Sequence, residues 1–115
     1  MPKSPNDKLQ GTLTLLILRT LKTRGPLHGY GLLEHIHGVS NELLQVEEGS
    51  LYPALHKLED KGLIVAEWGI TDLNRRAKFY RLTAAGKKQL RTSHDYWSRF
   101  AGAVSRVLET APVRA

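Results

Sequence analysis

The sequence predicts a mainly helical α+β fold, and two observations support this prediction. Apolar residues recur at helical spacing in four segments. Two shorter segments, LIVAEWGI and AKFYRLT, are rich in the β-branched and aromatic residues that favour strands. The 115 residues contain no cysteine, which suits a reducing cytoplasm and excludes disulfides, thiolate catalysis and cysteine-type zinc sites. A length of 115 residues fits one modest domain.

The first helix is expected at residues 8–23, after a flexible polar tail at residues 1–8. Its leucines cover more than one stripe, and a helix that is apolar on most sides is buried on most sides. In so short a chain, this pattern points to a second surface supplied by another subunit. The sequence Arg24-Gly25-Pro26 ends the helix, because glycine caps it and proline cannot continue it.

A short second helix is expected at residues 29–37. Tyr30 and Leu33 fall on one side of it, together with Ile36 or His37. Glycines within this stretch weaken the helix, because glycine has a low helix propensity.

The third helix is expected within the segment EEGSLYPALHKLEDKGLI, which starts at residue 47, and it ends at Gly62. Leu51, Leu55 and Leu58 are spaced to anchor one face of this helix. The outward positions are then Ser50, Tyr52, Pro53, His56, Lys57 and Asp60.

Pro53 allows two interpretations of the start of this helix. If Ser50 caps the helix, Pro53 lies in the first turn, where its missing N–H loses no hydrogen bond. If the helix starts near Glu48, Pro53 removes one hydrogen bond to Gly49 and bends the first turn. In both cases the N-terminus is stiffened, and Gly49 lets another backbone approach closely.

The two strand-like segments predict a β-hairpin at residues 63–83, with residues 71–76 as its loop. Thr83 is then the N-cap of a final helix that runs to about Leu108.

Three helices followed by a basic hairpin is the order of a winged helix-turn-helix domain. The sequence therefore predicts a flexible tail at residues 1–8, a winged helix-turn-helix DNA-binding domain at residues 9–83, a C-terminal helix at residues 84–110 and a tail at residues 111–115.

The net charge of +6 is distributed unevenly along the chain. Residues 1–40 carry +3, residues 41–60 carry −4, and residues 61–115 carry +7. A soluble surface explains a positive net charge, and so does a polyanionic partner attracted mainly by the second half of the chain.

The third helix corresponds to the helix that enters the DNA major groove in a helix-turn-helix unit. Ser50, Tyr52, His56 and Lys57 carry groups that donate hydrogen bonds to phosphates or bases. The alternative is that Tyr52 and Pro53 pack the turn. Four carboxylates in and around this helix repel phosphates, so we expect it to supply specificity and little affinity.

The hairpin is the expected source of affinity. Arg75, Arg76 and Lys78 lie at and after its loop, and such a basic tip can follow the minor groove or the flanking backbone. Lys3 and Lys8 are expected to add phosphate contacts on the opposite flank. A charge run is often only a solvated loop, but its position after a recognition helix favours the DNA role.

Three segments resemble the PadR family of bacterial transcriptional regulators: HGYGLLEHI, GSLYPALHKLEDKGLI and KFYRLTAAGKKQL. The resemblance extends from about Leu13 to Leu90. It implies a winged-helix domain with a C-terminal helical element that forms a homodimer, usually acting as a repressor.

The resemblance also implies which residues contact DNA. They lie at the start and on the exposed face of the third helix, in the second helix and in the wing. These positions are Ser50, Tyr52, Pro53, His56, Lys57, Tyr30, Arg75, Arg76 and Lys78. The chain has room for a single C-terminal helix, and in this it resembles the short members of the family. Some of those members bind flat aromatic compounds at the dimer centre.

The last helix carries a heptad pattern, which predicts a dimerisation helix. Its members step by four and three residues: Leu90, His94, Trp97, Ala101, Val104 and Leu108. Leu9 and Leu13 of the first helix are expected in the same interface.

Aromatic residues gather on the same helix, at Trp97, Phe100 and Tyr96, with His94 nearby. An aromatic stripe is often part of a core. In a dimer seam it can instead form a flat pocket for a small aromatic effector.

The sequence contains no constellation for catalysis or metal binding. It has no nucleophile with a matching base, no Gly-rich phosphate loop and no metal-ligand spacing of histidines, so no enzyme activity, cofactor or metal is expected. No apolar run is long enough to span a bilayer, and the first residues lack an apolar signal core. A bacterial cytoplasmic location is therefore expected.

The combined prediction is a homodimeric winged-helix repressor that binds a short inverted-repeat operator in double-stranded DNA and is relieved by a small aromatic effector. The alternative is a small-molecule or protein-interaction module that uses the winged helix as a dimer scaffold and binds no DNA. Absence of duplex binding even at low salt would favour this alternative.

Overall fold

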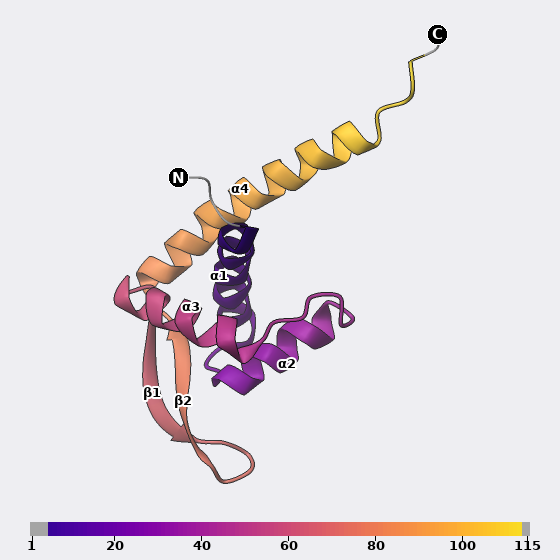
Figure 1. Ribbon diagram of the computed structural model, residues 1–115. Coiled ribbons are helices and arrows are strands. Elements are labelled where there is room, and N and C mark those ends of the chain that lie inside the picture. Colours follow the sequence, from indigo (N-terminus) through magenta and orange to yellow (C-terminus); the bar gives the residue numbers. More distant parts are fainter. Residues whose placement is uncertain (1–4, 114–115) are drawn as a thin grey trace.

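The computed structural model describes residues 5–113, and it describes side chains from residue 11 onward. Within these residues the chain forms three helices, a two-stranded hairpin and a long final helix, in the predicted order (Figure 1). The bounds are α1 Pro5–Arg24, α2 Gly29–Val39, α3 Glu48–Asp60, β1 Ile64–Ile70, β2 Arg76–Leu82 and α4 Ala84–Leu108. The mainly helical α+β fold class is thereby confirmed.

Some boundaries differ from the prediction. α1 includes residues 5–8, which were expected in the flexible tail. α2 continues to Val39, two residues beyond its expected end. In the hairpin, Arg76 already pairs with Ile70, so the loop shortens to residues 71–75.

The helices and the hairpin share one core, with α1 at its centre. α1 packs against α2, α3, α4 and β2. The largest fully buried side chains among the described residues are Ile17, Leu18, Leu32, Leu51, Leu55, Leu58 and Ile64. α1 is thus apolar on most sides because its own chain surrounds most of it, and a partner subunit is not needed to explain that pattern.

An isolated antiparallel bridge joins Leu27 to the hairpin, and the sequence did not predict it. Leu27 donates its N–H to the Tyr80 carbonyl at 3.1 Å, and Tyr80 donates its N–H to the Leu27 carbonyl at 2.8 Å. This bridge fixes the turn between α1 and α2 on β2, and Tyr80 is only 5% exposed. The base of the hairpin is therefore attached to the helical body.

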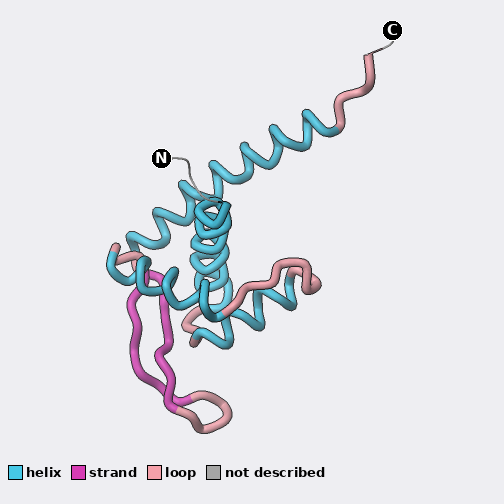
Figure 2. Tube along the Cα trace, viewed as in Figure 1, coloured by secondary structure: helices cyan, strands magenta, loops and turns pink. Residues whose placement is uncertain are grey.

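The first turns of α4 are attached to the end of α3. Thr83 caps α4 as predicted, because its hydroxyl accepts the Gly86 N–H at 3.0 Å, and the same hydroxyl donates to the Gly62 carbonyl at 2.8 Å. A Cβ at Gly86 would overlap the Leu63 carbonyl, so only glycine fits this approach. Beyond these turns α4 leaves the body, and Figure 2 shows it and the hairpin extending in opposite directions.

Candidate nucleic-acid interface

α3 separates a buried face from an exposed one, as its leucine spacing predicted. Leu51 and Leu55 are completely buried, and Leu58 is nearly so. Ala54 joins them in the core. The expected outward positions are all exposed: Ser50, Tyr52, Pro53, His56, Lys57 and Asp60. α3 therefore presents a polar surface on a helix whose position is fixed by the core.

The start of α3 decides between the two interpretations of Pro53. Glu47 is the N-cap residue, and its side chain makes no capping hydrogen bond. Ser50 already lies inside the helix and donates its N–H to the Glu47 carbonyl at 3.0 Å, so the proposed Ser50 cap is wrong. Because Pro53 has no N–H and lies within the helix, the Gly49 carbonyl lacks its usual helical donor.

Tyr52 reaches from α3 to the beginning of α2. A Cβ built on Gly29 would lie 2.7 Å from the Tyr52 hydroxyl oxygen. The packing of the Tyr52 ring against α2 therefore requires glycine at position 29. The Tyr52 side chain is nevertheless 43% exposed. Packing accounts for one edge of the ring, and the rest of it is available to a partner.

Tyr30 lies on the exposed side of α2 and is therefore separated from Leu33, with which the helical spacing had grouped it. The buried residues of α2 are Gly29, Leu32, Leu33 and Ile36, whereas Tyr30 is 61% exposed. Beside it, His28 caps α2 by accepting the Gly31 N–H at 3.3 Å, and its ring stacks on Phe79 of β2 with centroids 5.3 Å apart. Tyr30 thus stands next to the junction of α2 with the hairpin.

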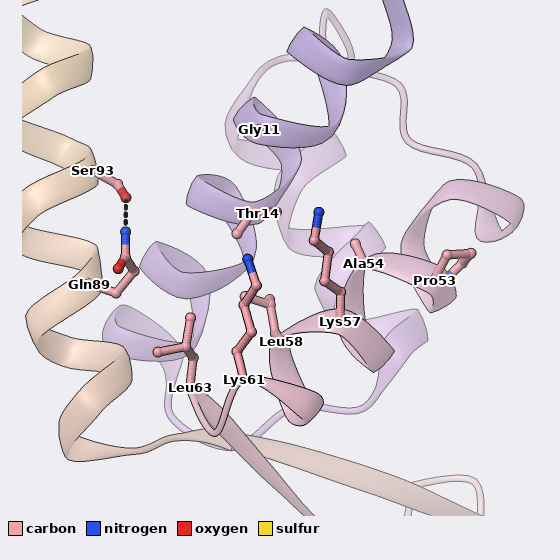
Figure 3. Close-up of a pocket in the computed structure, with 10 residues that line it drawn as sticks. All are labelled: Gly11, Thr14, Pro53, Ala54, Lys57, Leu58, Lys61, Leu63, Gln89 and Ser93. Atoms are coloured by element: carbon pink, nitrogen blue, oxygen red, sulfur yellow. Dashed lines mark hydrogen bonds between the residues drawn. The ribbon is translucent and has the colours of Figure 1, made fainter. Parts of the chain in front are cut away.

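Lys57 borders a cleft between α1, α3 and α4 (Figure 3). The cleft has a volume of about 590 Å³, and the side chains of Lys57 and Lys61 extend into it toward α1. On the α4 side, the Gln89 amide donates to the Ser93 hydroxyl at 2.9 Å. Lys57 therefore borders both the exposed surface of α3 and the cleft behind it.

The hairpin loop is an ordered turn that carries two arginines. Arg75 donates its N–H to the Thr71 hydroxyl at 3.2 Å, and its carbonyl accepts the Thr71 N–H at 2.8 Å. Its side chain is exposed. The guanidinium carbon of Arg76 lies 4.6 Å from the centre of the Trp68 ring, which is a cation–π distance. The tip therefore presents two cations whose backbone is well defined.

Lys78 belongs to the junction between α3 and the hairpin and not to the basic tip with which the sequence grouped it. Its Nζ lies 3.7 Å from the Glu59 carboxylate of α3 and 5.9 Å from the centre of the Tyr80 ring. Burial, followed by the charge of Glu59 and the proximity of Tyr52, raises the pKa of Tyr80 above its usual value. This cation already has a carboxylate partner within the chain.

The second half of α4 carries an uncovered apolar surface. Its exposed large side chains are Tyr96, Trp97, Phe100, Val104, Val107 and Leu108. The ring centroids of Trp97 and Phe100 are 6.0 Å apart, and those of Tyr96 and Phe100 are 6.4 Å apart. His94 is exposed on the same helix. The residues predicted for an effector site are therefore neighbours.

Two residues predicted for the dimer interface lie instead in the core of their own chain: Leu13 is 3% exposed and Leu90 is 5% exposed. The heptad spacing extends back to Leu90 because the apolar side of α4 packs on the core in the first turns and is exposed in the later turns. Lys3 lies outside the described residues, and Lys8 and Leu9 lie in the part of α1 whose side chains are not described.

A further uncovered apolar surface lies between α1 and the connection from α2 to α3. Leu43 is 84% exposed and Leu44 is 39% exposed. Together with Leu16 they line a groove of about 580 Å³. This surface was not predicted from the sequence, although two leucines in a short connector are a usable signal.

Residues 17–92, well over half of the chain, match the transcriptional regulator PadR-like family. The chain belongs to this family. Transcriptional regulator Rv3488 of Mycobacterium tuberculosis is 39% identical over 64 residues, which cover 56% of each protein. A solved PadR family regulator from Eggerthella lenta is 32% identical, with a TM-score of 0.71 over 90% of this chain and 88% of the other. A transcriptional regulator from Clostridium thermocellum is 27% identical, with a TM-score of 0.76 over 87% and 96%.

Membership confirms the predicted resemblance and the winged helix-turn-helix architecture. It also makes the chain a transcriptional regulator and not an enzyme. In the described part of the chain, no group of three or more His, Cys, Asp or Glu residues is placed to hold a metal ion. None of the helices in that part is long and apolar enough to cross a membrane.

Proposed function

We propose that this PadR-family regulator is a homodimeric repressor that binds a short inverted repeat in double-stranded DNA in the bacterial cytoplasm. The observation that carries the proposal is the junction of α3 with the hairpin. There, the Lys78–Glu59 contact of 3.7 Å joins α3, with its exposed polar face, to the strand that leads from the Arg75–Arg76 tip. One element suits the major groove, and the other suits the flanking backbone.

The two elements are proposed to contribute differently to binding. α3 offers side chains for base edges and helix positioning: Ser50, Tyr52, Pro53, His56 and Lys57, with Tyr30 of α2 at its edge. Its four nearby carboxylates limit its attraction for phosphates. Arg75 and Arg76 contribute attraction for any duplex, because phosphate contacts carry no direct sequence information.

Two uncovered apolar surfaces support the homodimer. Trp97, Phe100 and Val104 on α4 are each more than two-fifths exposed, and a contiguous apolar patch of this kind is typical of an interaction site. We propose that α4 packs on α4 of the partner, with Ala101, His94 and Leu108 in the seam. The groove beside Leu43 and Leu44 offers the partner a further apolar surface.

This dimer would place two α3 helices in successive major grooves, about 34 Å apart along the DNA. A flat aromatic effector bound beside Trp97, Phe100, Tyr96 and His94 would favour one angle between the two α4 helices. Because DNA binding requires a particular spacing of the α3 helices, such a ligand shifts the population toward or away from the DNA-binding state.

The proposal is tested by selecting bound fragments from random duplexes with the purified full chain. We expect enrichment of an inverted repeat whose half-sites are one helical turn apart. If the protein retains no duplex even at low salt, DNA binding is wrong, and an interaction module built on the same dimer becomes the better account.

The dimer is tested by Val104→Glu, which places a charge in the proposed α4 seam. We expect a monomer in sedimentation equilibrium and a loss of operator affinity of about a hundredfold or more, because the second half-site no longer adds avidity. Ser98→Glu adds the same charge on the polar side of α4 and should leave the dimer intact. A dimeric Val104→Glu variant would contradict the proposed seam.

A further inference from the structure

Among the described side chains, one ion pair connects α3 to the hairpin. Lys78 and Glu59 approach to 3.7 Å, and their side chains are only 36% and 27% exposed. The other ion pairs of the described residues differ from it. Arg81–Glu67 lies within the hairpin and Arg99–Asp95 lies within α4, and all four of those side chains are more than half exposed. The side chains of the Lys78–Glu59 pair are thus the least exposed of the three pairs.

The surroundings of this pair fix both of its partners. Glu59 lies in the last turns of α3, which Leu55 and Leu58 hold in the core. Lys78 lies on β2, two residues before Tyr80. Tyr80 is 5% exposed, and the centre of its ring lies 5.9 Å from the Lys78 ammonium. The proximity of Glu59 also helps to raise the pKa of Tyr80. The ammonium therefore has a carboxylate and an aromatic ring as neighbours.

We propose that Glu59 is a specificity-determining residue that acts through Lys78, by holding the Lys78 ammonium away from DNA phosphates. This inference rests on the proposed DNA-binding function. Its consequence is that the hairpin approaches any duplex with one cation fewer than its sequence suggests.

The physical reason is competition for one ammonium group. Each phosphate neutralised by a lysine or arginine contributes about 0.9 to the slope of log affinity against log salt. A phosphate contact of this kind strengthens binding to operator and to random DNA alike. Specificity is a difference of affinities, so withholding a cation from phosphates lowers binding to wrong sites without removing any contact to a base.

The test uses the full chain and a duplex of random sequence over a range of salt concentrations. Glu59→Gln keeps the shape of the side chain and releases Lys78. We expect the salt slope of this variant to steepen by about 0.9 and its affinity for random DNA to rise several-fold. Lys78→Gln should leave the slope unchanged, and the double variant should have the slope of the wild type.

Glu67→Gln is the matched control, because it removes the same charge from the exposed Arg81–Glu67 pair of the hairpin. Any effect of this control should persist in the Lys78→Gln background, whereas the effect of Glu59→Gln should vanish there. If Glu59→Gln steepens the slope equally with and without Lys78, removal of charge alone explains it, and the proposal is wrong.

The failure of this inference is distinguishable from failure of the proposed function. If the wild type binds random DNA and Glu59→Gln has an unchanged slope, the inference fails and DNA binding stands. If the wild type binds no duplex, both fail. The position of Glu59 is checked without DNA. Because the charge of Glu59 helps to raise the pKa of Tyr80, Glu59→Gln should lower that pKa in an NMR titration, and an unchanged pKa would show that Glu59 does not lie beside Tyr80 in solution.

Discussion

α3 and the hairpin are neighbours, but they are held in place differently. α3 buries four residues in the core: Leu51, Ala54, Leu55 and Leu58. The hairpin buries two residues, Ile64 and Tyr80, both toward its base, and residues 71–75 of its loop stand away from the body (Figure 1). A helix fixed by the core suits contacts that depend on sequence. A hairpin tip free of the core suits contacts with a backbone whose path varies.

The two regions also differ in charge: α3 is mainly acidic, and the hairpin is mainly basic. Segment 41–60 contains a single cation, Lys57, against five acidic residues, and α3 lies within it. The hairpin carries Arg75, Arg76, Lys78 and Arg81. Lys78 is the exception, because its contact with Glu59 attaches it to α3. The availability of a cation to DNA therefore depends on its carboxylate partner within the chain and not on its place in the sequence.

The largest expected effect tests how α3 is held. Leu55→Ala removes a fully buried side chain and should lower the free energy of unfolding by about 2–5 kcal/mol. Urea denaturation measures this value. His56→Ala, one residue further on the exposed face, should change it by no more than about 0.5 kcal/mol. Equal losses in the two variants would contradict the separation of the two faces of α3.

The next effect concerns Tyr52, which contacts α2 and is also exposed. Tyr52→Ala should reduce discrimination between operator and random DNA by about 1–3 kcal/mol, the size of one good contact to a base. Binding assays on both duplexes measure the difference. Gly29→Ala should reproduce part of this loss with the fold intact, because its Cβ forces the Tyr52 ring to move. Equal losses on both duplexes for Tyr52→Ala would argue against a sequence-specific role.

The smallest effect concerns Arg76 and the ring beneath it. Trp68→Ala removes the cation–π contact at 4.6 Å, worth about 0.5–1 kcal/mol at an exposed site. Affinity for any duplex should therefore fall by roughly two- to fivefold. Ile70→Ala removes another exposed side chain of the same strand that takes no part in the contact between Arg76 and Trp68, and it should leave affinity nearly unchanged. A similar fall for both variants would mean that Trp68 acts on the strand and not on Arg76.

The element order was predictable because spacing and turn residues act locally. The leucines of α3, the cap at Thr83 and the β-branched and aromatic residues of the hairpin each carry their own signal within a few residues. The bridge between Leu27 and Tyr80 was not predictable, because an isolated bridge of one residue leaves no periodic pattern in the sequence. The Lys78–Glu59 pair was missed for a related reason: its members lie on different elements, and no local rule brings them together.

The heptad of α4 shows the limit of spacing in another way. The pattern correctly placed Trp97, Val104 and Leu108 on one exposed side of the helix. It also included Leu90, which packs in the core of its own chain. Periodicity identifies which side of a helix is apolar, but the apolar partner of that side depends on where the helix leaves the body. Tyr30 shows the same limit in α2, because helical spacing grouped it with Leu33 although Leu33 is buried and Tyr30 is exposed.

The most direct test of the account is a pair of salt titrations on the selected operator and on a scrambled duplex, with the Arg75→Ala/Arg76→Ala variant beside Tyr52→Ala. We expect the arginine variant to lose affinity by the same factor on both duplexes and to flatten the salt slope by about 1.8. Tyr52→Ala should keep the wild-type slope and lose affinity only on the operator. The account is contradicted if the arginine variant loses discrimination while keeping its slope, or if Tyr52→Ala weakens both duplexes equally.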